Sequence, residues 1–168
     1  MKDENAYPNE NVLRFVKHRG LPTRSWGIAL DIGSGTGANA EALRAMGWAV
    51  HTIDIHPGVG ADFCEDIRDF DMPVGFYDLI LDCNTLCHVE DAPYQKLHEM
   101  LDGEGWFFSI HPTLETVPLI AAGRWTRKAS EWDMRESLKM FSKAKIDRAS
   151  YPDPRRGQIE SYIITADK

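Results

Sequence analysis

The sequence has few of the features that anchor a protein in a membrane or cross-link it outside the cell. It has three cysteines, Cys64, Cys83 and Cys87, and this odd, irregularly spaced set argues against a disulfide framework and favours reduced thiols. No apolar run approaches the roughly 20 residues that cross a bilayer, and the N-terminal MKDENAYPNE lacks a secretory pattern. We therefore expect a cytoplasmic protein without membrane contacts.

Length and composition describe one soluble domain. The chain has 168 residues, of which 43% are hydrophobic, and its 26 acidic and 19 basic side chains give a net charge of −7. This is too apolar for disorder and too short for two catalytic domains. The acidic balance argues against general attraction to nucleic acid.

Short β-prone runs alternate with helical segments, which predicts an α/β, Rossmann-like three-layer sandwich with a mostly parallel sheet. We expect a leading helix over 9–19, a helix from Thr36 to Met46, and a helix that follows Asp91. Only HPGVG separates the second and third expected strands, so we expect that crossover to be a loop. PDPRRG predicts a closing antiparallel hairpin. Seven strands are expected: Gly27–Ile32, Ala49–Ile55, Ala61–Cys64, Tyr77–Leu81, Gly105–Ile110, Ala144–Tyr151 and Gln158–Ala166.

The most informative segment is ALDIGSGTGANA, in which the first strand runs into Gly33, Gly35 and Gly37 and then into a helix. Glycines permit tight turns close to a ligand, and the helix directs free N–H groups at it. Gly33, Gly35 and Ala38 also satisfy the dinucleotide fingerprint, and Asp54 lies near the usual ribose-binding distance, so a nicotinamide cofactor stays an alternative. Asp31, however, is poorly placed beside a pyrophosphate and would suit a cationic group.

Five ordered motifs now resemble class I S-adenosylmethionine-dependent methyltransferases over about residues 12–168. They are DIGSGTG, HTIDIHP, CEDIRDF, YDLILDCNTLCHV and LHEMLDGEGWFFSI. The resemblance implies that S-adenosylmethionine is the cofactor and S-adenosylhomocysteine the product. It also implies a single methyltransferase domain: a lead-in (1–26), a cofactor-binding core (27–110), an acceptor-site cover (111–143) and a terminal strand pair (144–168).

The same resemblance assigns roles to individual residues. Asp31 would orient the methionine end of the cofactor, Asp54 would accept hydrogen bonds from both ribose hydroxyls, and Asp66 would accept from the adenine amino group. Cys83 and Asn84 would line the methionine arm. The full set of implied cofactor-binding residues is Asp31, Gly33, Ser34, Gly35, Gly37, Asp54, Ile55, Asp66, Ile67, Cys83 and Asn84.

Methyl transfer from a sulfonium is an in-line displacement, so the protein has mainly to align a nucleophile and exclude water. Where the acceptor must lose a proton, His88 and His111 are the candidate bases, because each follows the carboxyl end of a predicted strand. The alternative for His88 is a packing or cofactor contact. The cysteines with His88 do not form a paired metal motif, and we expect no metal.

The acceptor is expected to be a small molecule, since no separate recognition domain is present. Residues 124–156 nevertheless carry ten basic and five acidic side chains, so an anionic acceptor or nucleic acid stays open. DCNT stands where base-amino methyltransferases have an Asn/Asp-Pro-Pro-aromatic motif, which argues against that chemistry but not against RNA or protein acceptors. A noncatalytic cofactor-binding subunit and, third, an NAD-dependent oxidoreductase are the alternatives. The oligomeric state is left open.

Overall fold

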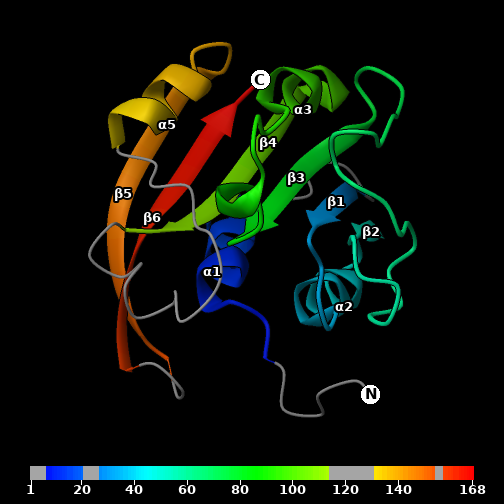
Figure 1. Ribbon diagram of the computed structural model, residues 1–168, viewed down its shortest axis with the longest axis horizontal. Coiled ribbons are helices and arrows are strands. Elements are labelled where there is room, and N and C mark those ends of the chain that lie inside the picture. The colour runs from blue at the N-terminus through cyan, green and yellow to red at the C-terminus, as the bar shows by residue number, and fades with distance from the viewer. Residues whose placement is uncertain (1–6, 21–26, 114–130, 154–156) are drawn as a thin grey trace.

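The computed structural model describes residues 7–20, 27–113, 131–153 and 157–168. In these ranges a six-stranded mixed sheet has the order β2-β1-β3-β4-β6-β5. Its strands are β1 (Ile28–Ile32), β2 (Ala49–Ile53), β3 (Tyr77–Cys83), β4 (Leu101–Pro112), β5 (Ser142–Asp153) and β6 (Gly157–Asp167). The first four pair in parallel, while β6 runs antiparallel to both β4 and β5. The predicted Rossmann-like fold and terminal hairpin are confirmed (Figure 1).

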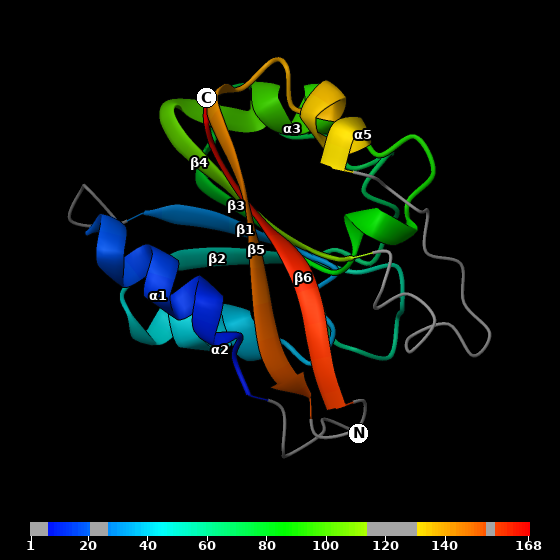
Figure 2. The same cartoon turned by 90° about the vertical axis from the view of Figure 1, so that its left-hand side faces the viewer.

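Helices cover both faces of the sheet, as Figure 2 shows in edge view. One layer contains α1 (Glu10–Arg19) and α2 (Ala38–Ala45), and the other contains α3 (Tyr94–Met100) and α5 (Glu131–Ser137). Alternate strand residues feed two buried clusters, one with Val12, Val16 and Leu43, and the other with Leu97 and other residues of the α3 side. None of the helices in the described ranges is long and apolar enough to cross a bilayer.

The predicted leading helix is confirmed, and its ends follow from local chemistry. The Asn9 side chain accepts a hydrogen bond from the Asn11 backbone N–H at the N-terminus, and Gly20 adopts the left-handed conformation at the C-terminus (φ 63°). The apolar face with Val12, Phe15 and Val16 is buried. The helix therefore serves the covering role expected of it.

The prediction of seven strands is corrected at Ala61–Cys64. This segment is not a strand: it forms a single parallel bridge between Phe63 and Ile53. No helix occurs between Ile53 and Tyr77, so the expected loop crossover is confirmed, and a connection this short does not bring a full parallel strand alongside β2. The described part of the sheet consequently ends at β2.

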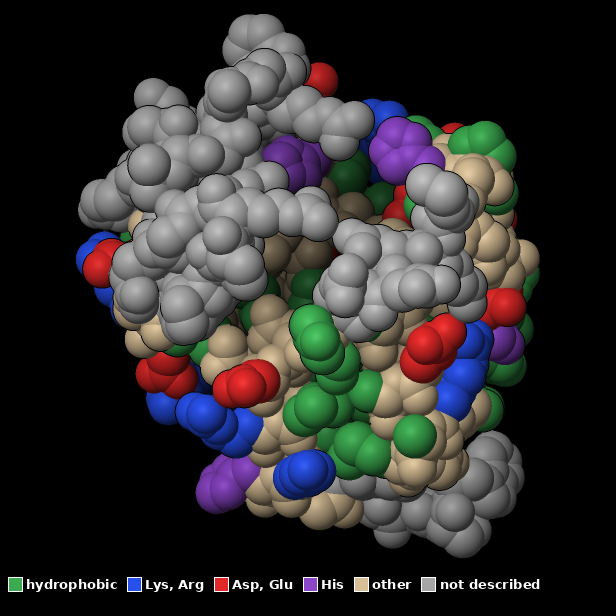
Figure 3. Space-filling view, turned by 90° about the horizontal axis from the view of Figure 1, so that it is seen from below, with side chains coloured by type: hydrophobic (Ala, Val, Ile, Leu, Met, Phe, Trp, Pro, Cys, Tyr) green, Lys and Arg blue, Asp and Glu red, His purple; other side chains and the backbone are tan. Residues whose placement is uncertain are grey.

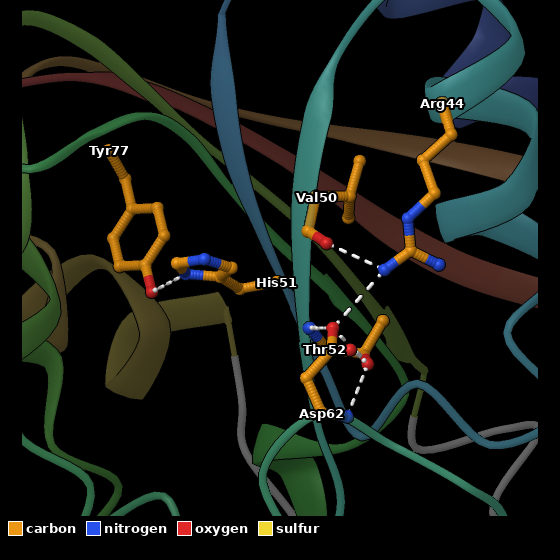
Figure 4. Close-up of polar contacts among 6 residues, drawn as sticks. All are labelled: Arg44, Val50, His51, Thr52, Asp62 and Tyr77. Atoms are coloured by element: carbon orange, nitrogen blue, oxygen red, sulfur yellow. Dashed lines mark hydrogen bonds and ion pairs between the residues drawn. The ribbon is translucent and has the colours of Figure 1, made fainter.

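Beside β2, the Asp62 carboxylate accepts a backbone hydrogen bond of the kind that a neighbouring strand would otherwise accept (Figure 4). Its Oδ2 accepts hydrogen bonds from the Thr52 backbone N–H at 2.9 Å and the Thr52 hydroxyl at 2.8 Å, and from Arg44 of α2 at 3.1 Å. Arg44 also donates to the Val50 carbonyl at 2.6 Å. Although partial burial acts in the opposite direction, the hydrogen bonds from Thr52 and the charge of Arg44 hold the pKa of Asp62 below its ordinary value. This cluster holds β2, which leads directly into Asp54.

Candidate active site

The carboxyl ends of β1, β2 and β3 meet at one edge of the sheet, where a cavity of about 590 Å³ opens. Parallel α/β sheets bind ligands at this edge. The space-filling view shows a hollow with histidine side chains beside it (Figure 3). Seven predicted site residues line the cavity: Gly33, Asp54, Ile55, Asp66, Ile67, Asn84 and His88.

The glycine turn closes the end of β1 against β2. The N–H groups of Gly33 and Ser34 donate to the Ile53 carbonyl at 2.7 and 3.2 Å. Gly33 has φ +62°, and a Cβ there would lie 1.9 Å from the Thr85 hydroxyl oxygen. Both the backbone conformation and the close approach of Thr85 therefore require glycine at position 33. Gly35 and Gly37 also have positive φ, and α2 begins directly after Gly37.

Asp54 lies at the end of β2 and is buried, with 8% of its surface exposed. Its Oδ2 accepts a hydrogen bond from the Gly35 N–H and its Oδ1 accepts one from the His56 N–H, both at 2.9 Å. A carboxylate oxygen has two lone pairs, so each retains an acceptor site. The carboxylate is held in place at the cavity and can accept from a pair of hydroxyl groups.

Asp31 is buried beneath the glycine turn, at 1% exposure. The Ala40 backbone N–H donates to its carboxyl group, but its Oδ2 has no hydrogen-bond partner. Burial, and then the negative charge of Asp82, raises the pKa of Asp31 to about 7. A cationic group would supply the donor and the positive charge that this carboxyl group lacks. Asp31 itself does not line the cavity, whereas its neighbours Ile32 and Gly33 do.

Asp66 lines the cavity, but its carboxylate already has a partner. Arg68 donates to Oδ1 through Nε at 3.0 Å and to Oδ2 through Nη2 at 2.6 Å, and its backbone N–H also donates to Oδ1. These hydrogen bonds hold the pKa of Asp66 below its ordinary value. The adjacent Ile67 is buried with its side chain in the core. An adenine contact by Asp66 would thus use lone pairs that Arg68 leaves unoccupied.

Cys83 and Asn84 end β3 at the same edge. Burial, and then the charge of Asp31, raises the pKa of the Cys83 thiol, and burial also raises that of Cys87. Both thiols therefore stay protonated, which argues against nucleophilic or metal-binding thiolates. Asn84 adopts φ 63° and its N–H donates to the Ile110 carbonyl at 2.9 Å. This conformation, tolerated by asparagine, redirects the chain into the short helix η1 (Leu86–His88).

The two candidate bases lie in different places. His88 lines the 590 Å³ cavity, whereas His111 lines a second cavity of about 320 Å³ between η1, α3 and α5. The two cavities share Val89. His111 is 3% exposed, and its Nε2 lies 3.2 Å from Asp82 Oδ2 without the alignment of a hydrogen bond.

Asp82 and Thr85 are two residues that the sequence motifs did not single out. Asp82 Oδ1 accepts from the N–H groups of Thr85 and Leu86, which fixes the start of η1, and Oδ2 accepts from the Ser109 hydroxyl at 2.6 Å. Asp82 therefore connects η1 to the end of β4, beside His111. The one feature of the sequence that could have marked Asp82 as a site residue is its position at the carboxyl end of a predicted strand.

The chain is similar to a known protein family, and this similarity agrees with a cofactor site at the sheet edge. A family model described as a methyltransferase domain matches residues 4–150. The chain therefore belongs to this methyltransferase family, and the predicted resemblance to S-adenosylmethionine-dependent methyltransferases is confirmed. No curated protein sequence matches the chain.

Solved structures with the same fold have low sequence identity. The Burkholderia thailandensis 1,6-didemethyltoxoflavin-N1-methyltransferase, solved with its acceptor and S-adenosylhomocysteine, is 19% identical at a TM-score of 0.71, covering 95% of this chain and 77% of that one. A Haemonchus contortus phosphoethanolamine N-methyltransferase 2 with bound S-adenosylmethionine is 15% identical at a TM-score of 0.75, covering 96% of this chain and 53% of that one. An Archaeoglobus fulgidus S-adenosylmethionine-dependent methyltransferase is 14% identical at a TM-score of 0.70, covering 95% and 94%.

Proposed function

We propose that this protein transfers a methyl group from S-adenosylmethionine to a small-molecule acceptor. The observation that carries the proposal is the buried Asp31 carboxyl group, whose Oδ2 has no donor and which lies on β1 two residues before the glycine turn. An amino group of the cofactor would satisfy it, whereas a pyrophosphate would add negative charge beside it. Asp54, held by Gly35 and His56, offers the matching acceptor for a ribose.

When bound, the cofactor supplies a methyl group on a sulfonium that is already activated for displacement. The chain's own residues then have three tasks: Asp31 and Asp54 fix the donor, Asp66 and Ile67 border its adenine end, and the cavity walls exclude water. Gly33 and Thr85 line the cavity together, and the absence of a Cβ at Gly33 leaves room for the Thr85 side chain there.

His111 is the proposed base for an acceptor that must lose a proton. Its ring is buried beside the cavity that adjoins the cofactor site, and Asp82 lies 3.2 Å from Nε2 as a positioning carboxylate. His88, which lines the cofactor cavity itself, is the second candidate. We also propose that the protein is cytoplasmic, which the unpaired thiols of Cys83 and Cys87 support.

Calorimetry with S-adenosylhomocysteine and, in parallel, NAD tests the cofactor. We expect S-adenosylhomocysteine to bind and NAD not to, and binding of NAD alone would reject the proposal. Transfer of radiolabel from methyl-labelled cofactor into fractionated metabolites, RNA and protein then tests the acceptor class. Label in RNA or protein would replace the small-molecule acceptor, and tight binding without any transfer would favour a noncatalytic subunit.

The base is tested by the His111→Gln and His88→Gln variants. If His111 removes the proton, His111→Gln should lower kcat by about 10²-fold or more with unchanged affinity for S-adenosylhomocysteine, and the pH–rate profile should lose a limb. Equal profiles for His111→Gln and the parent protein would exclude the role.

A further inference from the structure

The second cavity is next to the proposed cofactor cavity, as the acceptor site of a methyltransferase would be. It adjoins the cofactor cavity through Val89 and is bounded by η1, α3, α5 and the end of β4. Its volume is about 320 Å³. One water molecule takes about 30 Å³ in the liquid, so the cavity suits a small molecule of roughly ten non-hydrogen atoms.

The charged side chains in the described part of its lining are all acidic. Asp91, Asp133 and Glu136 contribute carboxylates, and none of the described lining residues is a lysine or arginine. Asp91 and Asp133 make other interactions in the protein, and Glu136 pairs with Lys139 at 2.5 Å. Each of the three carboxylates thus already has a partner, and what they offer a ligand is additional acceptor oxygens at the cavity wall. Acceptor oxygens on the described side of the cavity favour a ligand that donates hydrogen bonds, such as an ammonium, over a carboxylate or phosphate.

His111 supplies an independent observation that points to a ligand at this cavity. The side chain is 3% exposed, it lines the cavity, and neither ring nitrogen has a hydrogen-bond partner. Buried polar atoms are nearly always paired, and a lone buried histidine in a polar cavity fits a role toward a bound molecule. Nδ1 in particular is the ring nitrogen not placed beside Asp82.

We infer that this cavity binds the methyl acceptor and that the acceptor is a small amine. The inference rests on the proposed function and adds the substrate class to it. Leu86, Ala92 and Met134 supply apolar contacts for the carbon skeleton, and the carboxylates favour its ammonium. Among the described residues, α5 contributes Asp133 and Glu136 to the lining. Arg124, Arg127, Lys128, Arg155 and Arg156, five of the basic side chains that left an anionic acceptor open, lie outside the described residues.

The transfer step balances with His111 as base. The ammonium gives one proton to His111, which frees the nitrogen lone pair. That lone pair forms the new N–C bond to the methyl carbon while the C–S bond breaks and sulfur keeps its electron pair. The products are the methylated amine, still protonated as an ammonium, and the thioether S-adenosylhomocysteine, and His111 returns its one proton to solvent.

Two probe pairs of matched shape and opposite charge test the acceptor class: benzylamine with benzoate, and butylamine with butyrate. Each is titrated by calorimetry into the protein with and without saturating S-adenosylhomocysteine. We expect each amine to bind at least tenfold more tightly than its carboxylate, and to shift the His111 ring resonances in NMR spectra. Equal or tighter binding of the carboxylates in both pairs would overturn the inference.

Variants on α5 locate the effect. Asp133→Asn together with Glu136→Gln should reduce the amine preference at least fivefold, because both residues line the cavity. Glu131→Gln is the matched control: Glu131 lies on the same helix, pairs with Arg135 at 2.7 Å and is not a lining residue, so the preference should persist. An unchanged preference in the double variant would remove this cavity from the acceptor site.

The two levels of the proposal fail separately. If S-adenosylhomocysteine binds and the amines do not bind preferentially, the amine inference fails and methyl transfer stands. If S-adenosylhomocysteine does not bind, the proposed function fails, and the titrations without it still report whether the cavity prefers amines.

Discussion

Asp31→Asn should make the ligand-free protein more stable while weakening its hold on the cofactor. The pKa of Asp31 is raised from 3.8 to about 7 by burial and then by the charge of Asp82. A shift of about 3 units corresponds to about 4 kcal/mol at 1.36 kcal/mol per unit. The ionised carboxylate therefore costs the native state about that much above pH 7, and a neutral asparagine removes this cost.

The direction with pH follows from proton linkage. Between pH 3.8 and about 7 the native state keeps a proton that the unfolded chain has lost, so the stability of the native state falls as pH rises through this window. The raised pKa of Asp31 lowers the free energy of unfolding by about 2 kcal/mol at pH 5 and by about 4 kcal/mol at pH 8. Asp31→Asn should thus gain about 2–3 kcal/mol more, relative to the parent protein, at pH 8 than at pH 5.

Urea unfolding of the parent and the variant at pH 5 and pH 8 measures this difference, and other contributions of the asparagine cancel between the two pH values. Asp71→Asn serves as the control, because the Asp71 side chain is 87% exposed and should show the parent's pH dependence. Identical pH dependence in Asp31→Asn and the parent would refute the reasoning. Calorimetry at pH 8 completes the test, since the stabilised variant should bind S-adenosylhomocysteine more weakly.

The remaining predictions concern the cavity and the sheet edge. Asp54→Ala should weaken S-adenosylhomocysteine binding by about 1–3 kcal/mol, measured by calorimetry, and unchanged affinity in a folded variant would remove Asp54 from the site. Gly33→Ala should lower the free energy of unfolding by about 2 kcal/mol or more through its φ of +62° and the contact with Thr85, and adding Thr85→Ala should recover part of that loss in urea unfolding. Asp62→Ala should cost about 1–2 kcal/mol of stability by leaving the Thr52 N–H without its carboxylate. Urea unfolding at neutral pH would reveal the loss, and because the pKa of Asp62 is lowered in the native state, the loss should shrink as acid protonates the carboxylate.

Local patterns were sufficient for much of the fold. The strand–glycine–helix sequence around Gly33 requires a turn that only glycine adopts without strain, and PDPRRG joins two β-prone runs too closely for anything but a hairpin. Asp54 was predicted to lie near the glycine turn, and it does, because consecutive parallel strands end at the same edge; its hydrogen bond from the Gly35 N–H at 2.9 Å was not predicted. These features depend on residues near one another in the chain.

Other features came from contacts between distant segments. The β-prone run at Ala61–Cys64 predicted a strand, but the short crossover limits this segment to a single bridge. The Asp62 carboxylate, and not a strand carbonyl, accepts the hydrogen bond from the Thr52 N–H. The pairing of Asp66 with Arg68 is local, since the two are only two residues apart, but it depends on side-chain geometry that spacing does not reveal. For the same reason, the partners of a site residue were less predictable than its position.

By itself, the sequence determined the α/β class, the glycine turn, the order of the motifs and hence the family, because turn chemistry and hydrophobic period act over a few residues. Only the tertiary structure decided that Asp31 is buried without a partner for one oxygen, and that His88 and His111 face different cavities. It also brought Asp82 beside His111, 29 residues further along the chain. Burial and proximity across strands depend on how the whole sheet is ordered and covered, so they fix the electrostatics of the site only once the chain has folded.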